Sequence, residues 1–302
     1  MPSAFSSVFI TQMRLAKGIL KNLDIESSRK YQDILGDLSS KALAGKVRFE
    51  NVGFENFEAA MALPEDTKRS GAVFLYLHGG AYTAGSLSYA KGFGGVVAER
   101  FSAPCLCAAY RLAPEHPFPA ALDDAVSAYA YLCERHDPRR LFLIGESAGG
   151  GLCFSLILRI IEKGLSLPLP AGVITISPWT DLTLSGASVN GNAQCDPSLS
   201  EKALMHSAGL YAGDAGTDNP LVSPLFADLS SFPPCMVFAG GSEILRDDGT
   251  RIAEKLTASG SKCELYVEEG LWHAYVLFPV PEAKNALDRI ETFVRDLLDG
   301  IE

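Results

Sequence analysis

A serine between small residues is the strongest chemical signal in this sequence. Gly145-Glu146-Ser147-Ala148-Gly149 fits the pattern G-x-S-x-G, after the strand-like run LFLI and before the helix-like run GLCFSLILRII. In that context a strand reverses into a helix within a few residues, which strains the serine backbone and places it at a partly positive helix N-terminus. The pattern predicts that Ser147 is a nucleophile. The alternative is an ordinary tight turn in which Ser147 caps the helix.

A second motif lies upstream, where the apolar run AVFLYL ends. In His78-Gly79-Gly80-Ala81 the two glycines let the backbone turn its N–H groups toward the point where negative charge develops on a carbonyl oxygen. We predict an oxyanion hole made by Gly79, Gly80 and Ala148, although the motif alone would also suit a plain glycine turn. His78 ends a strand beside this loop, so we expect it to hydrogen-bond to the backbone and not to act as a base.

A general base is expected late in the chain, because one of the orders that catalytic triads use is serine, acid, histidine. His273 lies after the strand-like run CELYVEE and before the last helix-like segment, and no histidine other than His273 follows residue 206. This position predicts that His273 moves the proton. The alternative is a surface-loop histidine without a chemical role.

Three carboxylates compete for the role of the acid that orients the histidine. They are Glu243, Asp247 and Asp248, all shortly after the strand-like run PCMVFAG. Glu243 is closest to the end of this strand, whereas the two aspartates lie where the next helix begins and can serve as caps there. We therefore expect Glu243 to be the triad acid, with Asp247 as the second choice.

Short strand-like runs alternate with helix-like runs from about residue 46, which is typical of a mostly parallel sheet covered by helices. The expected strands are 46–53, 57–63, 72–77, 104–109, 141–145, 172–177, 235–239 and 263–268. The first two have little room for a crossover helix between them, so we expect them to pair antiparallel at an edge and the others to run parallel. The expected helices are 89–101, 119–135, 148–163, 247–259 and 282–299.

Two segments do not fit this alternation. They are residues 1–45 and a polar, glycine-rich insertion at 182–222, and an insertion of that size in an α/β core is usually functional. We therefore expect the segment 1–45 and the insertion 182–222 to form a helical cap over a hydrolase core made of residues 46–181 and 223–302.

The composition limits the partners and the compartment. A net charge of −10 over 302 residues argues against nucleic acid and anionic membranes, which would be repelled. The longest apolar stretch, Leu152 to Ile161, is too short for a membrane span. Most of the seven cysteines lie in apolar runs, among them Cys105, Cys107, Cys153 and Cys235, which favours buried reduced thiols. The first twenty residues have apolar side chains at helical spacing and no basic residues ahead of them, which argues against a secretory signal and predicts a cytoplasmic enzyme with an amphipathic first helix. An organelle transit peptide in the first twenty residues is the alternative.

Several stretches together resemble the hormone-sensitive-lipase family of microbial esterases. They are HGGA at 78–81, YRLAPEHPFPA at 110–120, GESAGG at 145–150, SPWTDLT at 177–183 and SEILRDDG at 242–249. The resemblance implies an eight-stranded α/β-hydrolase core with a helical cap, and hydrolysis of short acyl esters without metal or cofactor. It also implies that Glu243 is the acid. The usual family motif there is Asp followed by Pro, whereas this chain has Glu243-Ile244, and Glu146 likewise replaces a common Asp.

These features lead to the hypothesis of a serine carboxylesterase that acts on a small-molecule ester of short to medium chain length. We expect Tyr82 and Trp272 to line the substrate pocket, unless they are plain packing residues. A homodimer is left open. The alternatives are an amidase, lactonase or deacetylase that uses the same site, or a receptor with a hydrolase fold that binds a small ligand without catalysis.

Overall fold

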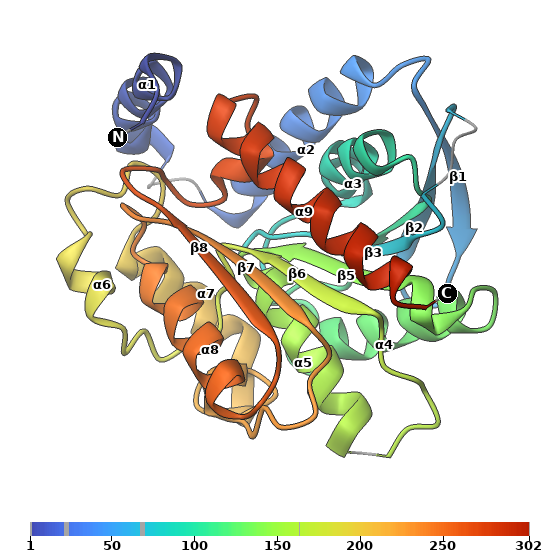
Figure 1. Ribbon diagram of the computed structural model, residues 1–302. Coiled ribbons are helices and arrows are strands. Elements are labelled where there is room, and N and C mark those ends of the chain that lie inside the picture. Colours follow the sequence, from blue (N-terminus) through green and yellow to red (C-terminus); the bar gives the residue numbers. More distant parts are fainter. Residues whose placement is uncertain (1, 21–23, 67–69, 163, 302) are drawn as a thin grey trace.

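An eight-stranded sheet forms the centre of the molecule, with the strand order β1-β2-β4-β3-β5-β6-β7-β8 (Figure 1). The computed structural model describes residues 2–20, 24–66, 70–162 and 164–301. The strands are β1 (Val47–Gly53), β2 (Glu58–Pro64), β3 (Val73–Leu77), β4 (Cys105–Ala109), β5 (Leu141–Glu146), β6 (Gly172–Ile176), β7 (Cys235–Gly240) and β8 (Cys263–Glu268). Each expected strand is present, and its ends differ by at most one residue from the prediction.

The strand directions are also as predicted. β1 and β2 pair antiparallel at one edge, and β3 to β8 run parallel to one another. Parallel strands are covered on both faces, so their side chains are apolar without alternation, and every residue of β3 and β5 is buried. The prediction of a mostly parallel sheet with an antiparallel edge is confirmed.

Helices cover both faces of the sheet (Figure 1). One face carries α4 (Ala120–Cys133), α5 (Ala148–Glu162) and α8 (Arg246–Ala258), and the other carries α3 (Leu87–Phe101) and α9 (Pro281–Asp299). Their ends lie within two residues of the predicted ones. Some positions of the expected segments lie outside the described residues. They are residue 163, which was expected to end the helix after Ser147, and residues 1, 21–23, 67–69 and 302.

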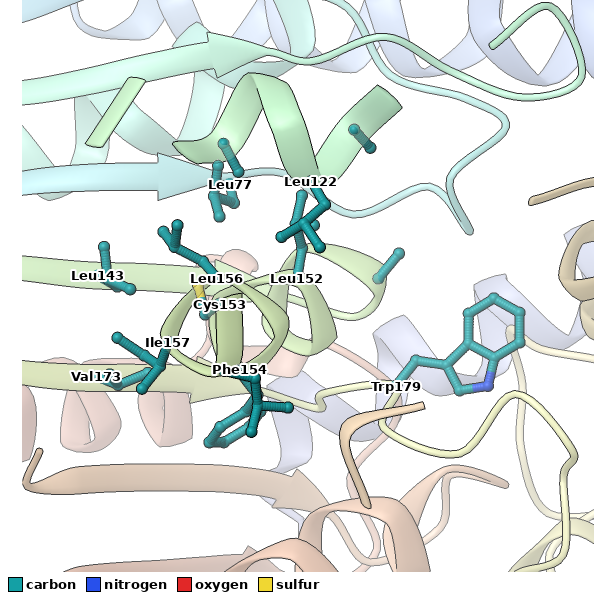
Figure 2. Close-up of a cluster of buried hydrophobic side chains, with 14 of the residues drawn as sticks. Leu77, Leu122, Leu143, Leu152, Cys153, Phe154, Leu156, Ile157, Val173 and Trp179 are labelled. Atoms are coloured by element: carbon teal, nitrogen blue, oxygen red, sulfur yellow. The ribbon is translucent and has the colours of Figure 1, made fainter. Parts of the chain in front are cut away.

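Alternate residues of each strand serve the two cores. Leu75 and Leu77 of β3 point into the core beneath α5, whereas Phe74 and Tyr76 point into the core beneath α3 and α9. Figure 2 shows the first of these cores: side chains of α5, among them Leu152, Leu156 and Ile157, lie against Leu77, Leu143 and Val173 of the sheet. This packing fixes the position of α5, and therefore of its first turn, which directly follows Ser147.

The N-terminal segment forms two helices, α1 (Ala4–Leu20) and α2 (Ile25–Ala42). α2 can lie close against α3 because Gly36 has no side chain: a Cβ there would lie 2.3 Å from the Ser88 carbonyl oxygen. α1 packs Phe9 against Trp272, and the Ser6 hydroxyl donates to Glu282 on α9. Both helices are therefore bound to the body of the protein beside the loops that follow the strands.

The insertion and the loops contain shorter helices. They are α6 (Ala187–Gly191), α7 (Glu201–Ala212) and the 3-10 turns η1 (Pro138–Arg140), η2 (Gly213–Ala215), η3 (Pro224–Phe226) and η4 (Tyr275–Leu277). The cysteines are free thiols as predicted, four of them buried and Cys195 of the insertion exposed. In the part of the chain that the structure describes, no helix is long and apolar enough to cross a membrane.

Candidate active site

Ser147 occupies the sharp turn between β5 and α5. Its φ is 55°, in the left-handed region that non-glycine residues rarely adopt, and its N–H donates to the Ile176 carbonyl oxygen of the neighbouring strand. The flanking glycines are required by space: a Cβ on Gly145 would lie 2.5 Å from the Gly149 carbonyl oxygen, and one on Gly149 would lie 2.0 Å from that of Leu77. The strained serine turn predicted from the pattern is therefore present.

His273 and Glu243 meet on adjacent loops at the carboxyl ends of β8 and β7. His273 Nδ1 lies 2.6 Å from Glu243 Oε2, and Glu243 Oε1 accepts a hydrogen bond from the Gly240 N–H at 2.8 Å. The Glu243 side chain is fully buried. Asp247, the second choice for the acid, instead accepts from the Ser188 N–H and pairs with Arg246. The structure therefore brings Glu243, and not Asp247, to the histidine.

The ionisation of His273 depends on two opposing effects. Burial of the ring disfavours its charged form, but the hydrogen bond to Glu243 and the negative charges of Glu243, Asp196 and Glu146 together outweigh this cost, so the pKa of His273 is raised above the usual 6.5. The loop is fixed by a further contact, since the Ala274 N–H donates to the Ser177 hydroxyl at 2.9 Å. Such a histidine can accept a proton and is stabilised once it carries it.

Ser147 and His273 line one cavity of about 310 Å³. The cavity wall comes from six parts of the chain: α2, the loop after β3, α3, the turn before α5, the insertion up to α7, and the loop after β8. The lining residues are Ser28, Gln32, Gly79, Gly80, Ala81, Thr83, Ala84, Tyr89, Glu146, Ser147, Ser198, Leu199, Ser200, Ala203, Leu204, Ser207, His273 and Ala274. Two side chains separated by more than a hundred residues thus face the same small space.

The oxyanion loop differs from the prediction at one position. The Gly79 N–H donates to Glu146 Oε1 at 2.6 Å, so it is already committed to a carboxylate, and the expectation that Gly79 contributes to the oxyanion hole is corrected. Within the described ranges no group accepts from the N–H of Gly80 or Ala81. Ala148 begins α5, where N–H groups have no partner inside the helix. Ala81, with φ of 54°, belongs to the same motif and is a further candidate donor that was not predicted from the sequence.

His78 supports this loop as expected. Its ring is fully buried, its Nδ1–H donates to the Gly79 carbonyl oxygen at 2.7 Å, and it stacks on Tyr110 with ring centroids 4.3 Å apart. Burial lowers the pKa of His78 to about 4, so the ring is neutral at pH 7. Gly85 makes room for it, because a Cβ there would lie 2.1 Å from the ring.

The two aromatic residues expected in the substrate pocket do not line this cavity. Tyr82 is buried and stacks on Tyr211 with ring centroids 3.7 Å apart, and Trp272 is fully buried between Phe9 and Phe278. Both are packing residues, the alternative that we had kept open. The residues of the cavity wall that the sequence did not reveal include Ser28 and Gln32 of α2, Tyr89 of α3, and the residues from Ser198 to Ser207 that lead into and form part of α7.

Glu146 is a buried carboxyl group directly beside Ser147. Its Oε1 accepts from the Gly79 N–H and from the Tyr89 hydroxyl. Burial raises the pKa of Glu146 from 4.5 to about 7, even though these hydrogen bonds favour the charged form. Above pH 7 the ionisation of Glu146 costs free energy in the folded protein that it does not cost in the unfolded chain, where the carboxyl group is hydrated.

We therefore expect Glu146→Gln to stabilise the fold in a pH-dependent way. Between pH 4.5 and about 7 the folded state keeps a proton that the unfolded state releases, so stability falls as the pH rises through this window. Above about pH 7 the glutamine, which is neutral and can still accept from the Gly79 N–H, should raise the free energy of unfolding by up to about 3 kcal/mol. Urea unfolding at several pH values measures this difference.

The matched control is Glu254→Gln on the exposed side of α8. This substitution removes the same charge from solvent, so it should leave the pH dependence of stability close to that of the wild type. A Glu146→Gln protein whose stability follows the wild type at every pH would contradict the prediction.

A strained serine at the carboxyl end of a central strand in a sheet of this order defines the α/β-hydrolase class. Comparison with known families agrees: a family model described as alpha/beta hydrolase fold matches residues 74–277. The chain is 35% identical over 233 residues to an acetyl-hydrolase of Streptomyces hygroscopicus, with 76% of this chain and 77% of that relative covered. It is 36% identical over 229 residues to an esterase of Acinetobacter venetianus, with 74% and 75% covered.

The solved structures narrow the class further. A crystal structure of an esterase from the bacterial hormone-sensitive lipase family superimposes with a TM-score of 0.90 at 33% identity, covering 98% of this chain and 99% of that one. The chain belongs to this hormone-sensitive-lipase family of α/β hydrolases, as its motifs indicated, and it is a carboxylic ester hydrolase.

Proposed function

We propose that the chain is a serine carboxylesterase that hydrolyses short- to medium-chain acyl esters through an acyl-enzyme intermediate. One observation carries the proposal: Ser147 and His273 face the same cavity, and His273 is held by a buried Glu243 at 2.6 Å. The small volume of the cavity, about 310 Å³, supports short acyl or alcohol groups.

In the first half of the reaction, Ser147 Oγ forms a bond to the ester carbonyl carbon while its proton passes to His273. The negative charge moves to the carbonyl oxygen, where the N–H groups of Gly80, Ala81 and Ala148 stabilise it. The C–O bond to the alcohol then breaks, and His273 donates its proton to the leaving oxygen. Throughout, Glu243 keeps the ring oriented and stabilises its charged form.

In the second half, water replaces the alcohol. His273 accepts a proton from the water as it attacks the acyl carbonyl carbon, and the proton then returns to Ser147 as the acid leaves. The segments 1–45 and 182–222 are proposed as the cap over this site, supported by Ser28 and Gln32 of α2 and Ser207 of α7 in the cavity wall. The free cysteines support a cytoplasmic location.

The test is a panel of p-nitrophenyl esters of increasing acyl length, run beside a fluorophosphonate probe. We expect hydrolysis to be fastest with acetate to hexanoate and to fall with longer chains, and the probe to label Ser147. Anilides and lactones of matched size serve as competing substrates. Faster turnover of these, or binding without any turnover or labelling, would favour the amidase, lactonase or receptor alternatives.

A further inference from the structure

Asp196 is a buried carboxylate near the active site that the proposed reaction does not use. It lies in the insertion, directly before the cavity wall, and only 2% of its surface is exposed. Its Oδ1 accepts from the N–H groups of Ser198 and Leu199, at 2.7 and 2.9 Å, and both of these residues line the cavity. One oxygen of Asp196 therefore shapes the wall of the cavity.

The other oxygen reaches the loop that carries the triad acid. Asp196 Oδ2 accepts from the Ile244 N–H at 2.9 Å, and Ile244 directly follows Glu243. Asn192, from the same segment, donates to the carbonyl oxygens of Gly241 and Glu243 at 3.1 and 2.8 Å. The insertion thus holds the acid loop on both sides of Glu243.

This link depends on the residue that follows the acid. The family motif usually has Pro at this place, and a proline has no N–H to donate. Ile244 supplies the donor, so the departure from Asp-Pro to Glu243-Ile244 has a structural counterpart in the position of Asp196.

The charge of Asp196 also acts on the histidine. The ion pairs of the described residues do not include Asp196, and Lys17 Nζ binds its backbone carbonyl oxygen instead of its carboxylate. Three acidic groups act on His273 electrostatically: Glu243 from the loop after β7, Asp196 from the insertion and Glu146 from the end of β5. All three favour the charged ring.

We propose that Asp196 is a positioning residue for the hydrolysis: through the Ile244 N–H it holds Glu243 in place against His273, and through Ser198 and Leu199 it fixes the adjoining cavity wall. The inference rests on the proposed function. It predicts that turnover falls to a similar extent whether the hydrogen bond between Asp196 and the Ile244 N–H is lost by changing the acceptor or by changing the donor.

The experiment compares Asp196→Asn and Ile244→Pro, alone and combined, with Ile244→Ala. In Asp196→Asn the one remaining oxygen should stay with the three donors of Ser198 and Leu199. The amide nitrogen then meets the Ile244 N–H as a second donor, and this hydrogen bond is lost. Ile244→Pro removes the N–H, whereas Ile244→Ala loses more of the apolar side chain but keeps the donor.

We expect Asp196→Asn and Ile244→Pro each to lower kcat by about tenfold or more with a smaller change in KM, because a displaced acid misorients the base. The double variant should be no slower than the slower single variant, since both remove the same bond. Ile244→Ala keeps the N–H and should lower kcat by a smaller factor than Ile244→Pro. In Asp196→Asn the acid limb of the kcat/KM profile should move to lower pH, because a negative charge that favours protonated His273 is gone.

A merely structural role would not move that acid limb. Asp124→Asn is the matched control, because Asp124 of α4 is also 2% exposed but pairs with Arg111, outside the cavity. It should lower stability and leave the acid limb in place. An Asp196→Asn protein with wild-type kcat and acid limb, additive losses in the double variant, or an Ile244→Ala protein as slow as Ile244→Pro would overturn the proposal.

Failure of the proposed function is distinguishable from failure of this inference. A wild-type protein without esterase activity refutes the function. An NMR titration of His273 in the wild type and in Asp196→Asn then tests the inference without turnover, and an unchanged midpoint refutes it. If Asp196→Asn does not fold, the comparison of Ile244→Pro with Ile244→Ala decides.

Discussion

Ser147→Ala is expected to reduce kcat for p-nitrophenyl butyrate by a factor on the order of 10⁵ to 10⁶. The substitution removes the only atom that forms the bond to the acyl carbon in the proposed reaction. The fold should survive, because the turn is held by backbone contacts, such as the Ser147 N–H to the Ile176 carbonyl oxygen. Stopped-flow and end-point assays measure the residual rate, and circular dichroism and thermal unfolding check the fold.

The control for this substitution is Ser185→Ala, which removes a hydroxyl that binds Asp181 away from the cavity. It should hydrolyse the ester at close to the wild-type rate. Turnover by a folded Ser147→Ala protein within tenfold of the wild type would refute the assignment of the nucleophile.

Glu243→Gln has the second largest expected effect, a loss of about 10³ to 10⁴ in kcat. The glutamine has nearly the same shape and can still accept from the Gly240 N–H. It cannot carry the charge that stabilises protonated His273, and its amide can impose the wrong tautomer on the ring. Steady-state kinetics should therefore show a low kcat with KM changed much less.

Asp247→Asn is the matched control for Glu243→Gln, since both substitutions remove one carboxylate charge from the same stretch of chain. Asp247 contacts Ser188 and Arg246, so its replacement should cost some stability and little activity. A reversed result, with Asp247→Asn inactive and Glu243→Gln active, would show that Asp247 orients the histidine during the reaction.

The parts of the site that were predicted from sequence are those whose chemistry depends on local chain geometry. A turn that forces φ of 55° on Ser147 needs glycines at fixed offsets, and these are visible in the sequence. The strands were placed well because buried parallel strands are continuous apolar runs that end in glycine or polar residues. The position of His273 followed from the order of elements along the chain.

The errors concern contacts between segments that are distant in sequence. The Gly79 N–H is taken by Glu146, 67 residues later, and nothing in the His78-Gly79-Gly80 motif shows this. Trp272 is next to His273 in the chain, but successive side chains can point to opposite sides, and its ring packs against α1. The link from Asp196 to Ile244 spans 48 residues and involves a backbone N–H, which every non-proline residue has.

The exposed thiol of Cys195 offers a practical way to observe the proposed cap. Cys105, Cys107, Cys153 and Cys235 are buried, so a maleimide dye or a nitroxide spin label would react first at the residue that directly precedes Asp196. Such a reporter would lie on the segment around Asp196, which contacts both the cavity wall and the loop of Glu243. Its fluorescence or its spectral line shape could then report the motion of this segment as an ester enters and its acid departs.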